Sequence, residues 1–144
     1  MRSKNDAKRW VEKAKQFYKS SGKRIALAEF TNPNGAFNED EMYIFVLGCK
    51  GTMLGHGVND KFVGEEFIDL KDSEGKYFIK EIIDAANVQG SGWVTYRWYH
   101  PVLKRWLPKI VYFEKVDEMI ICSGVYDHTA MVTEEKRPLA AVAR

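Results

Sequence analysis

Cysteine is scarce in this sequence, which has only two, Cys49 and Cys122, in 144 residues. There is no C-x-x-C pair and no Cys/His cluster with the spacing of zinc ligands, so a disulfide framework and a structural zinc site are excluded. Each cysteine is flanked by apolar, strand-like sequence. We therefore expect both to be buried free thiols, since free cysteine commonly serves as a small core residue.

Long hydrophobic runs and an excess of one charge are also missing. No stretch approaches the ~20 apolar residues that a transmembrane helix needs, and the start from Met1 to Asp6 carries no export signal. The 22 basic and 20 acidic residues give a net charge of +2 and no clustered basic face, which argues against nucleic-acid binding. The sequence thus predicts no membrane contact by this chain. Two hypotheses for its location stay open, the cytoplasm or excision from a receptor.

The side chains that could act in catalysis have no second catalytic group suitably placed in the sequence. Glu65–Glu66 and Glu134–Glu135 are neighbours in sequence and so point apart, whereas acid/base chemistry needs convergent carboxyl groups. The Gly-Ser-Gly run 90–92 follows an expected helix and has no lysine after it, so it is not a phosphate-binding loop. Of the three histidines, His100 precedes a proline in a turn and His128 lies in the tail, and no catalytic triad can be assembled. We expect no enzyme, no cofactor and no metal site.

Apolar residues make up 45% and aromatic residues 13% of the chain, enough for one compact core in a single domain. From Ala7 to Ser20 the apolar positions recur at spacings of three and four, which predicts a helix capped by Asn5 or Asp6. Lys23 to Phe30 fits a short helix slightly better than a strand, and the turn residues 32–35 end it.

The remaining pattern predicts strands around one further helix. Met42 to Leu47 is an apolar run typical of a strand buried on both faces. The other expected elements are a partner strand Thr52 to Gly57, a helix Tyr77 to Val88, and strands Trp93 to Tyr99, Ile110 to Val116 and Met119 to Tyr126. Short loops between consecutive strands indicate an α+β fold with an antiparallel sheet. We divide the one domain into an N-terminal helix (1–22), a core (23–127) and a C-terminal tail (128–144).

Short motifs along the chain, in the same order, resemble the single Cache domain of type 2. They are Asn32-Pro33-Asn34-Gly35-x-Phe37, Tyr43-Ile44-Phe45-Val46, Gly51-Thr52-x-Leu54-x-His56-Gly57, Val63-Gly64, Asp69-Leu70-Lys71-Asp72 with Gly75-Lys76, Gly92-Trp93-Val94-x-Tyr96-x-Trp98, Pro101, Pro108-Lys109 and Gly124-Val125-Tyr126. The resemblance extends from about Trp10 to Tyr126. It departs from the family at Gly48-Cys49-Lys50, where an acidic residue is usual, and the sequence contains no membrane helix, kinase or methyl-accepting segment.

The resemblance implies a PAS-like fold, in which a long N-terminal helix packs on a twisted antiparallel sheet of about five strands, with a ligand pocket on one sheet face. Cache domains are mostly extracytoplasmic sensors of chemoreceptors and histidine kinases. Their usual ligands are small carboxylates such as acetate, propionate, lactate or pyruvate. We therefore expect a sensor that binds a small organic acid for signal transduction, as in chemotaxis. A homodimer and a signalling partner or fused output domain are further expectations.

Lys109 and His56 are the candidate polar ligand contacts. A small carboxylate needs a fixed cation to offset its desolvation, and Lys109 lies between a proline and apolar residues, an unusual place for a solvated lysine. By itself this pattern still fits a lysine that faces water, but the resemblance places Lys109 in the pocket. It also places His56 facing the ligand. A neutral imidazole there would donate one hydrogen bond, and an ordinary pKa of ~6.5 would make binding depend on pH.

Aromatic residues are the candidate pocket lining. Strict strand alternation puts Tyr96 and Trp98 on one face and Trp93 on the other, so all three line one pocket only if the strand is bulged; otherwise they are sheet core. Tyr112 is a further candidate donor, although alternation separates it from Lys109. The expected apolar walls are Tyr43, Phe45 and Phe37.

Two alternatives to an acid sensor remain. The chain is a ligand-free interaction module that dimerises through the apolar stripe of its first helix, in which case its own side chains fill the pocket. Or it is a haem or metal sensor centred on His56, although no second ligand is spaced to support that role.

Overall fold

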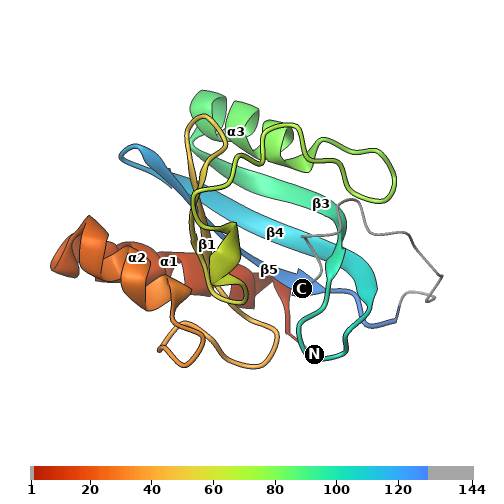
Figure 1. Cartoon of the computed structure of the whole chain (residues 1–144), viewed down its shortest axis with the longest axis horizontal. Coiled ribbons are helices and arrows are strands. Elements are labelled where there is room, and N and C mark those ends of the chain that lie inside the picture. The colour runs from red at the N-terminus through yellow and green to blue at the C-terminus, as the bar shows by residue number, and fades with distance from the viewer. Residues whose placement is uncertain (1, 130–144) are drawn as a thin grey trace.

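The computed structural model describes residues 2–129 and forms two layers of helix around an antiparallel sheet (Figure 1). The sheet has five strands in the order β2-β1-β5-β4-β3. Its strands are β1 (Phe45–Gly48), β2 (Met53–His56), β3 (Ser91–Tyr99), β4 (Trp106–Val116) and β5 (Met119–Tyr126). The helices are α1 (Lys4–Ser21), α2 (Lys23–Thr31) and α3 (Phe78–Gln89), with a short 3-10 helix at Asp60–Phe62. This arrangement confirms the α+β, PAS-like expectation.

α1 begins one turn earlier than the sequence pattern predicts. Ser3 is the N-cap, and its backbone N–H donates to the Asp6 carboxylate at 2.7 Å, so Asp6 lies inside the first turn rather than before it. The helix ends at Gly22, whose φ of 86° suits glycine. The predicted apolar stripe is buried against the sheet, and the indole of Trp10 donates to the Phe37 carbonyl at 2.8 Å. α2 is a helix, which resolves the ambiguity of that segment.

The two sheet faces carry separate cores. α1 and α2 cover one face, where the core includes Phe30, Ile44 and Ile121. α3 and the loops between β2 and α3 cover the other, and the core there is richer in aromatic residues. Because side chains alternate along a strand, each strand residue belongs to one core or the other. Face membership therefore decides which candidate residues can meet.

β4 starts four residues before the predicted Ile110, at Trp106. The strand thus includes Pro108, although proline is rare in central strands. The Pro108 carbonyl accepts from the Asp127 N–H at 2.9 Å, just beyond the last paired residue of β5, Tyr126. The missing N–H of Pro108 thus faces a position where the neighbouring strand has ended. The β4–β5 ladder begins at the next residue, Lys109, which is therefore held inside a strand.

Other boundaries differ less. β5 matches its predicted range, while the strand predicted from Met42 to Leu47 begins only at Phe45 and extends to Gly48. Cys122 is buried as expected, and burial raises the pKa of its thiol, whereas Cys49 is half-buried. Of the predicted tail 128–144, residues 130–144 lie outside the described residues. No helix within residues 2–129 combines the length and apolar character that crossing a membrane requires.

The close packing of β4 on β5 predicts the effect of Gly124→Ala. A Cβ at Gly124 would lie 2.7 Å from the Ile110 carbonyl oxygen and 3.0 Å from the Lys109 Cε. We expect this overpacking to lower the free energy of unfolding by about 1–3 kcal/mol in urea denaturation. Gly48→Ala is the matched control, since its nearest non-neighbour atom is 3.7 Å from the Cβ position. Equal effects of the two substitutions would contradict the predicted clash.

Candidate ligand-binding site

A cavity lies between the α3 side of the sheet and the segments that cover it. Its lining residues are Tyr43, Phe45, Met53, His56, Phe67, Phe78, Ile79, Tyr96, Trp98 and Lys109. The volume of this cavity that is open to the centre of a water molecule is about 10 Å³. That is room for about one water molecule. In this state the site is therefore closed and almost filled by its own side chains.

Lys109 places its ammonium group in this cavity. The residue is 1% exposed, and its Nζ donates to the Tyr43 hydroxyl at 2.7 Å. The ammonium lies 4.2 Å from the ring centroid of Tyr43 and 5.2 Å from those of Phe45 and Tyr126. Within residues 2–129 it has no carboxylate partner and Tyr43 is its only hydrogen-bond acceptor. An ammonium has three donors, so this buried cation is compensated by one neutral oxygen and the faces of aromatic rings.

His56 lines the same cavity and is held as a neutral ring. Its Nδ1 accepts from the backbone N–H groups of Val58 and Asn59 at 3.2 and 3.0 Å, which assigns the ring proton to Nε2. Burial, with a smaller contribution from the positive charge of Lys109, lowers the pKa of His56 to about 3. The expected pH-sensitive role is therefore wrong, because a ring with that pKa does not titrate near pH 6.5.

The structure brings together most, not all, of the candidate residues. Tyr96 and Trp98 line the cavity from β3, and Tyr96 stacks on Phe78 of α3 at 4.0 Å between centroids. Tyr43 and Phe45 also line the cavity. Whether these residues contact a ligand stays a prediction.

Three of the predicted site residues, Trp93, Tyr112 and Phe37, lie away from the cavity, which corrects their predicted position. β3 and β4 run without a bulge, so Trp93 and Tyr112 point to the α1 side of the sheet, where their rings pack at 5.0 Å between centroids. Trp93 is 41% exposed. Phe37 packs against Phe30 in the α1 core. Strand alternation had separated Trp93 from Tyr96 and Trp98, and Tyr112 from Lys109, and the sheet keeps both separations.

Sequence reasoning missed the polar role of Tyr43 and the part played by Tyr126. The hydroxyl groups of these two tyrosines lie 3.4 Å apart, and Tyr126 donates to the Tyr99 carbonyl at 3.1 Å. Both tyrosines lie in motifs of the Cache resemblance, but nothing in their spacing shows that the two segments meet across the sheet. Met53, Phe67, Phe78 and Ile79 were missed for the same reason, because they reach the cavity only through tertiary packing.

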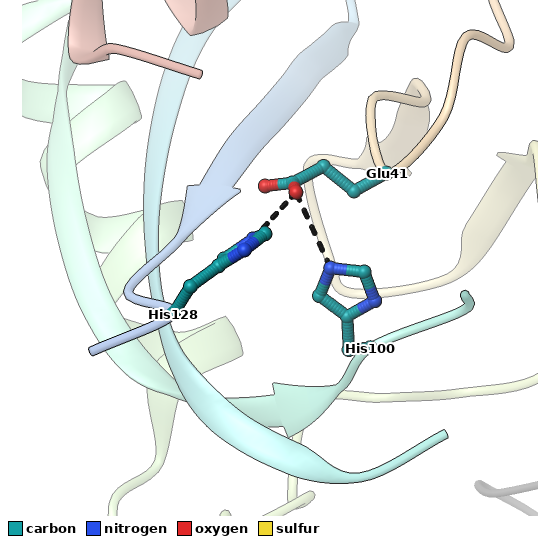
Figure 2. A group of neighbouring side chains, drawn as sticks. All are labelled: Glu41, His100 and His128. Atoms are coloured by element: carbon teal, nitrogen blue, oxygen red, sulfur yellow. Dashed lines mark hydrogen bonds and ion pairs between the residues drawn. The ribbon is translucent and has the colours of Figure 1, made fainter. Parts of the chain in front are cut away.

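A second polar cluster lies beyond the ends of β3 and β5, formed by Glu41, His100 and His128 (Figure 2). Glu41 is 6% exposed, and its Oε1 is 2.6 Å from the His128 Nε2 and 3.3 Å from the His100 Nε2. Its Oε2 accepts from the Tyr126 N–H at 3.2 Å. The cluster thus supplies the hydrogen bonds that a buried carboxylate requires.

The ligand atoms of this cluster are close enough to hold a metal ion, since they lie within 4.8 Å of one another. The hydrogen bonds of His100 oppose that role. Its Nδ1 accepts from the N–H groups of Val102 and Leu103 at 3.1 and 3.0 Å, so the ring proton is on Nε2, the nitrogen that a metal would need. Metal-binding histidines instead donate from their other nitrogen. Burial lowers the pKa of His100, which favours this neutral donor further.

Solved sensor domains share this fold. A methyl-accepting chemotaxis protein from Vibrio parahaemolyticus RIMD 2210633 is 22% identical, with a TM-score of 0.75 over 85% of this chain and 87% of that chain. A Cache chemosensory domain studied for carboxylic acid recognition is 23% identical, with a TM-score of 0.72 over 85% and 91% of the two chains. The periplasmic sensor domain of a chemotaxis protein is 24% identical, with a TM-score of 0.66 over 85% and 88%.

Residues 7–130 match the family model of the Cache domain. With the sheet, the N-terminal helix and the closed pocket in place, the molecule is a sensor-type α+β domain. The chain belongs to the Cache domain family. This family consists of ligand-binding and signalling modules rather than a class of enzymes.

The buried state of His56 predicts its titration. Because its folded pKa is about 3, the ring signals of His56 in a proton NMR titration should stay at their neutral positions from pH 8 to pH 5. In urea the same ring should titrate near ~6.5. The unfolded chain then binds a proton that the folded chain does not. Folding stability therefore falls as the pH drops below ~6.5, by up to about 1.4 kcal/mol per unit.

His56→Gln assigns these signals and removes this contribution to the acid sensitivity of folding. A folded-state titration of His56 with a midpoint near pH 6.5 would contradict the closed pocket.

Proposed function

We propose that this Cache domain is a sensor that binds a small organic acid in the cavity around Lys109. One observation carries the proposal, the buried ammonium of Lys109 without a carboxylate partner among residues 2–129. A cation in an apolar interior is unfavourable unless an anion or several hydrogen bonds compensate it. A ligand carboxylate would supply that anion and accept the remaining N–H donors.

Groups next to Lys109 also favour a ligand carboxylate in the cavity. The Nε2–H of His56 is the ring donor left over once Nδ1 accepts from the loop, and the ring stays neutral at any pH above about 3. The Tyr43 hydroxyl is within reach of the same ammonium. Aromatic walls such as Trp98 exclude water and so strengthen these contacts.

The cavity volume restricts the ligand and implies a conformational change. Room for about one water cannot accept even acetate, so binding requires the walls to separate. Met53 and Phe78 line the cavity from different segments, one from β2 and one from α3. Only acids of a few carbon atoms, such as acetate, propionate, pyruvate or lactate, suit a site that opens by a small displacement. The ligand then stabilises the open state by its differential affinity.

The similarity to a Cache chemosensory domain studied for carboxylic acid recognition supports the same ligand class, although the identity of 23% transfers the fold and not the ligand. Signal transduction, with an output partner or fused domain, follows from the family as part of this proposal.

Acid-dependent thermal stabilisation tests the proposal. Purified protein is heated with acetate, propionate, pyruvate or lactate, each against sodium chloride of equal ionic strength. An acid at 100 times its dissociation constant should add about 2.7 kcal/mol, a rise of several degrees in Tm. Lys109→Met should abolish this rise, because the methionine fills the site without a cation.

Lys115→Met is the matched control, since Lys115 lies on the same strand and does not line the cavity. The control variant should keep the full shift. A shift that persists in Lys109→Met would overturn the role of Lys109, and no shift with any acid would overturn the proposal.

The small cavity also favours a second candidate, the ligand-free interaction module. Side chains that already fill the pocket need no ligand to complete the core. Sedimentation equilibrium distinguishes the two functions. A dimer whose dissociation constant is unchanged by every acid, together with no thermal shift, would favour the interaction module.

A further inference from the structure

Tyr126 belongs to two hydrogen-bond networks at once. Its side chain is fully buried beside the cavity, where its ring lies 5.2 Å from the Lys109 ammonium. Its backbone N–H donates to Glu41 in the second polar cluster. In the sheet, Tyr126 is directly opposite Lys109, since the two are register partners of β5 and β4. One residue therefore connects the candidate pocket to the point where the chain leaves β5.

On the pocket side, the hydrogen bonds that include Tyr126 all donate in one direction. Burial holds the pKa of the Tyr126 hydroxyl well above its ordinary value, so the group keeps its proton. It donates a hydrogen bond to the Tyr99 carbonyl. Since a hydroxyl has one proton, Tyr126 must accept in its contact with Tyr43. The chain of donation runs from Lys109 to Tyr43 to Tyr126 to Tyr99. The middle contact is 3.4 Å, long for an O–H···O bond and thus the weakest link.

The other side ends at His128, two residues after β5. Glu41 accepts the Tyr126 N–H on Oε2 and the His128 Nε2 on Oε1, and Figure 2 shows both histidine rings directed at this carboxylate. The His100 ring packs on the Tyr126 ring at 4.6 Å between centroids and on the His128 ring at 5.1 Å. A displacement of Tyr126 therefore reaches His128 by a hydrogen bond and by ring packing.

We propose that occupancy of the Lys109 pocket is transmitted to the chain after β5 through Tyr43, Tyr126 and the Glu41–His128 hydrogen bond. This inference rests on the proposed function. A carboxylate that accepts the two remaining Lys109 donors pulls the ammonium toward itself and so lengthens its hydrogen bond to Tyr43. The Tyr43 hydroxyl then re-orients, the weak Tyr43–Tyr126 contact either closes or breaks, and Tyr126 shifts against Glu41. The segment leaving β5 is fixed to the domain differently in the two states, which is the differential interaction that a signal requires.

Histidine NMR tests this coupling in the intact chain. With only three histidines, each ring signal is assignable by single substitutions to Gln. His56 reports on the pocket and His128 on the exit from β5. Acetate, propionate, pyruvate and lactate are titrated in turn at constant pH and ionic strength. We expect one acid to move the His56 and His128 signals with the same dissociation constant.

The other outcomes separate the two proposals. A His56 response without a His128 response leaves the sensor function intact and overturns the coupling. No response of either ring to any acid overturns the sensor function and the coupling with it.

Tyr126→Phe tests the route. The substitution removes the hydroxyl that accepts from Tyr43 and keeps the ring and the backbone N–H on Glu41. We expect the His56 response to persist and the His128 response to be lost. Tyr112→Phe is the matched control, because its hydroxyl contacts Glu114 on the α1 side of the sheet; it should keep both responses. A His128 response that survives in Tyr126→Phe would overturn this route.

Discussion

Burying the Lys109 ammonium is the constraint around which the rest of the pocket is arranged. A charge in an apolar interior demands compensation, and here it comes from the Tyr43 hydroxyl and from three aromatic faces. The same positive charge helps to keep His56 neutral. Under the proposed function, a bound carboxylate would add the anion that this compensation lacks.

The two cores differ in the kinds of residue that they contain. On the α1 side, the buried stripe of Ala7, Val11 and Ala14 packs against the sheet. The α3 side holds the cation, the neutral imidazole and most of the aromatic rings. The polar chemistry of the pocket therefore lies on one face of the sheet, while the α1 layer packs on the other.

The buried carboxylate of Glu41 extends the same logic to the end of the sheet. Glu41, which lies before β1, accepts from His100 in the loop after β3, from Tyr126 at the end of β5 and from His128 just after it. Because the ring proton of His100 is on Nε2, this cluster is a set of hydrogen bonds rather than a metal site. These hydrogen bonds hold the residues that follow β5, and Tyr126 links them to the pocket.

The sequence by itself determined the helices, most strand ranges and the side on which each strand residue lies, because these depend on local periodicity. Alternation alone separated Tyr112 from Lys109, and Trp93 from its strand neighbours Tyr96 and Trp98. The family motifs marked Lys109, His56, Tyr96 and Trp98 as candidates. Tertiary structure decided what those residues meet. The Lys109–Tyr43 bond, the Tyr126 connection and the Glu41 cluster join residues 59 to 87 positions apart. No local pattern encodes such distances; they follow from the order in which the strands pair.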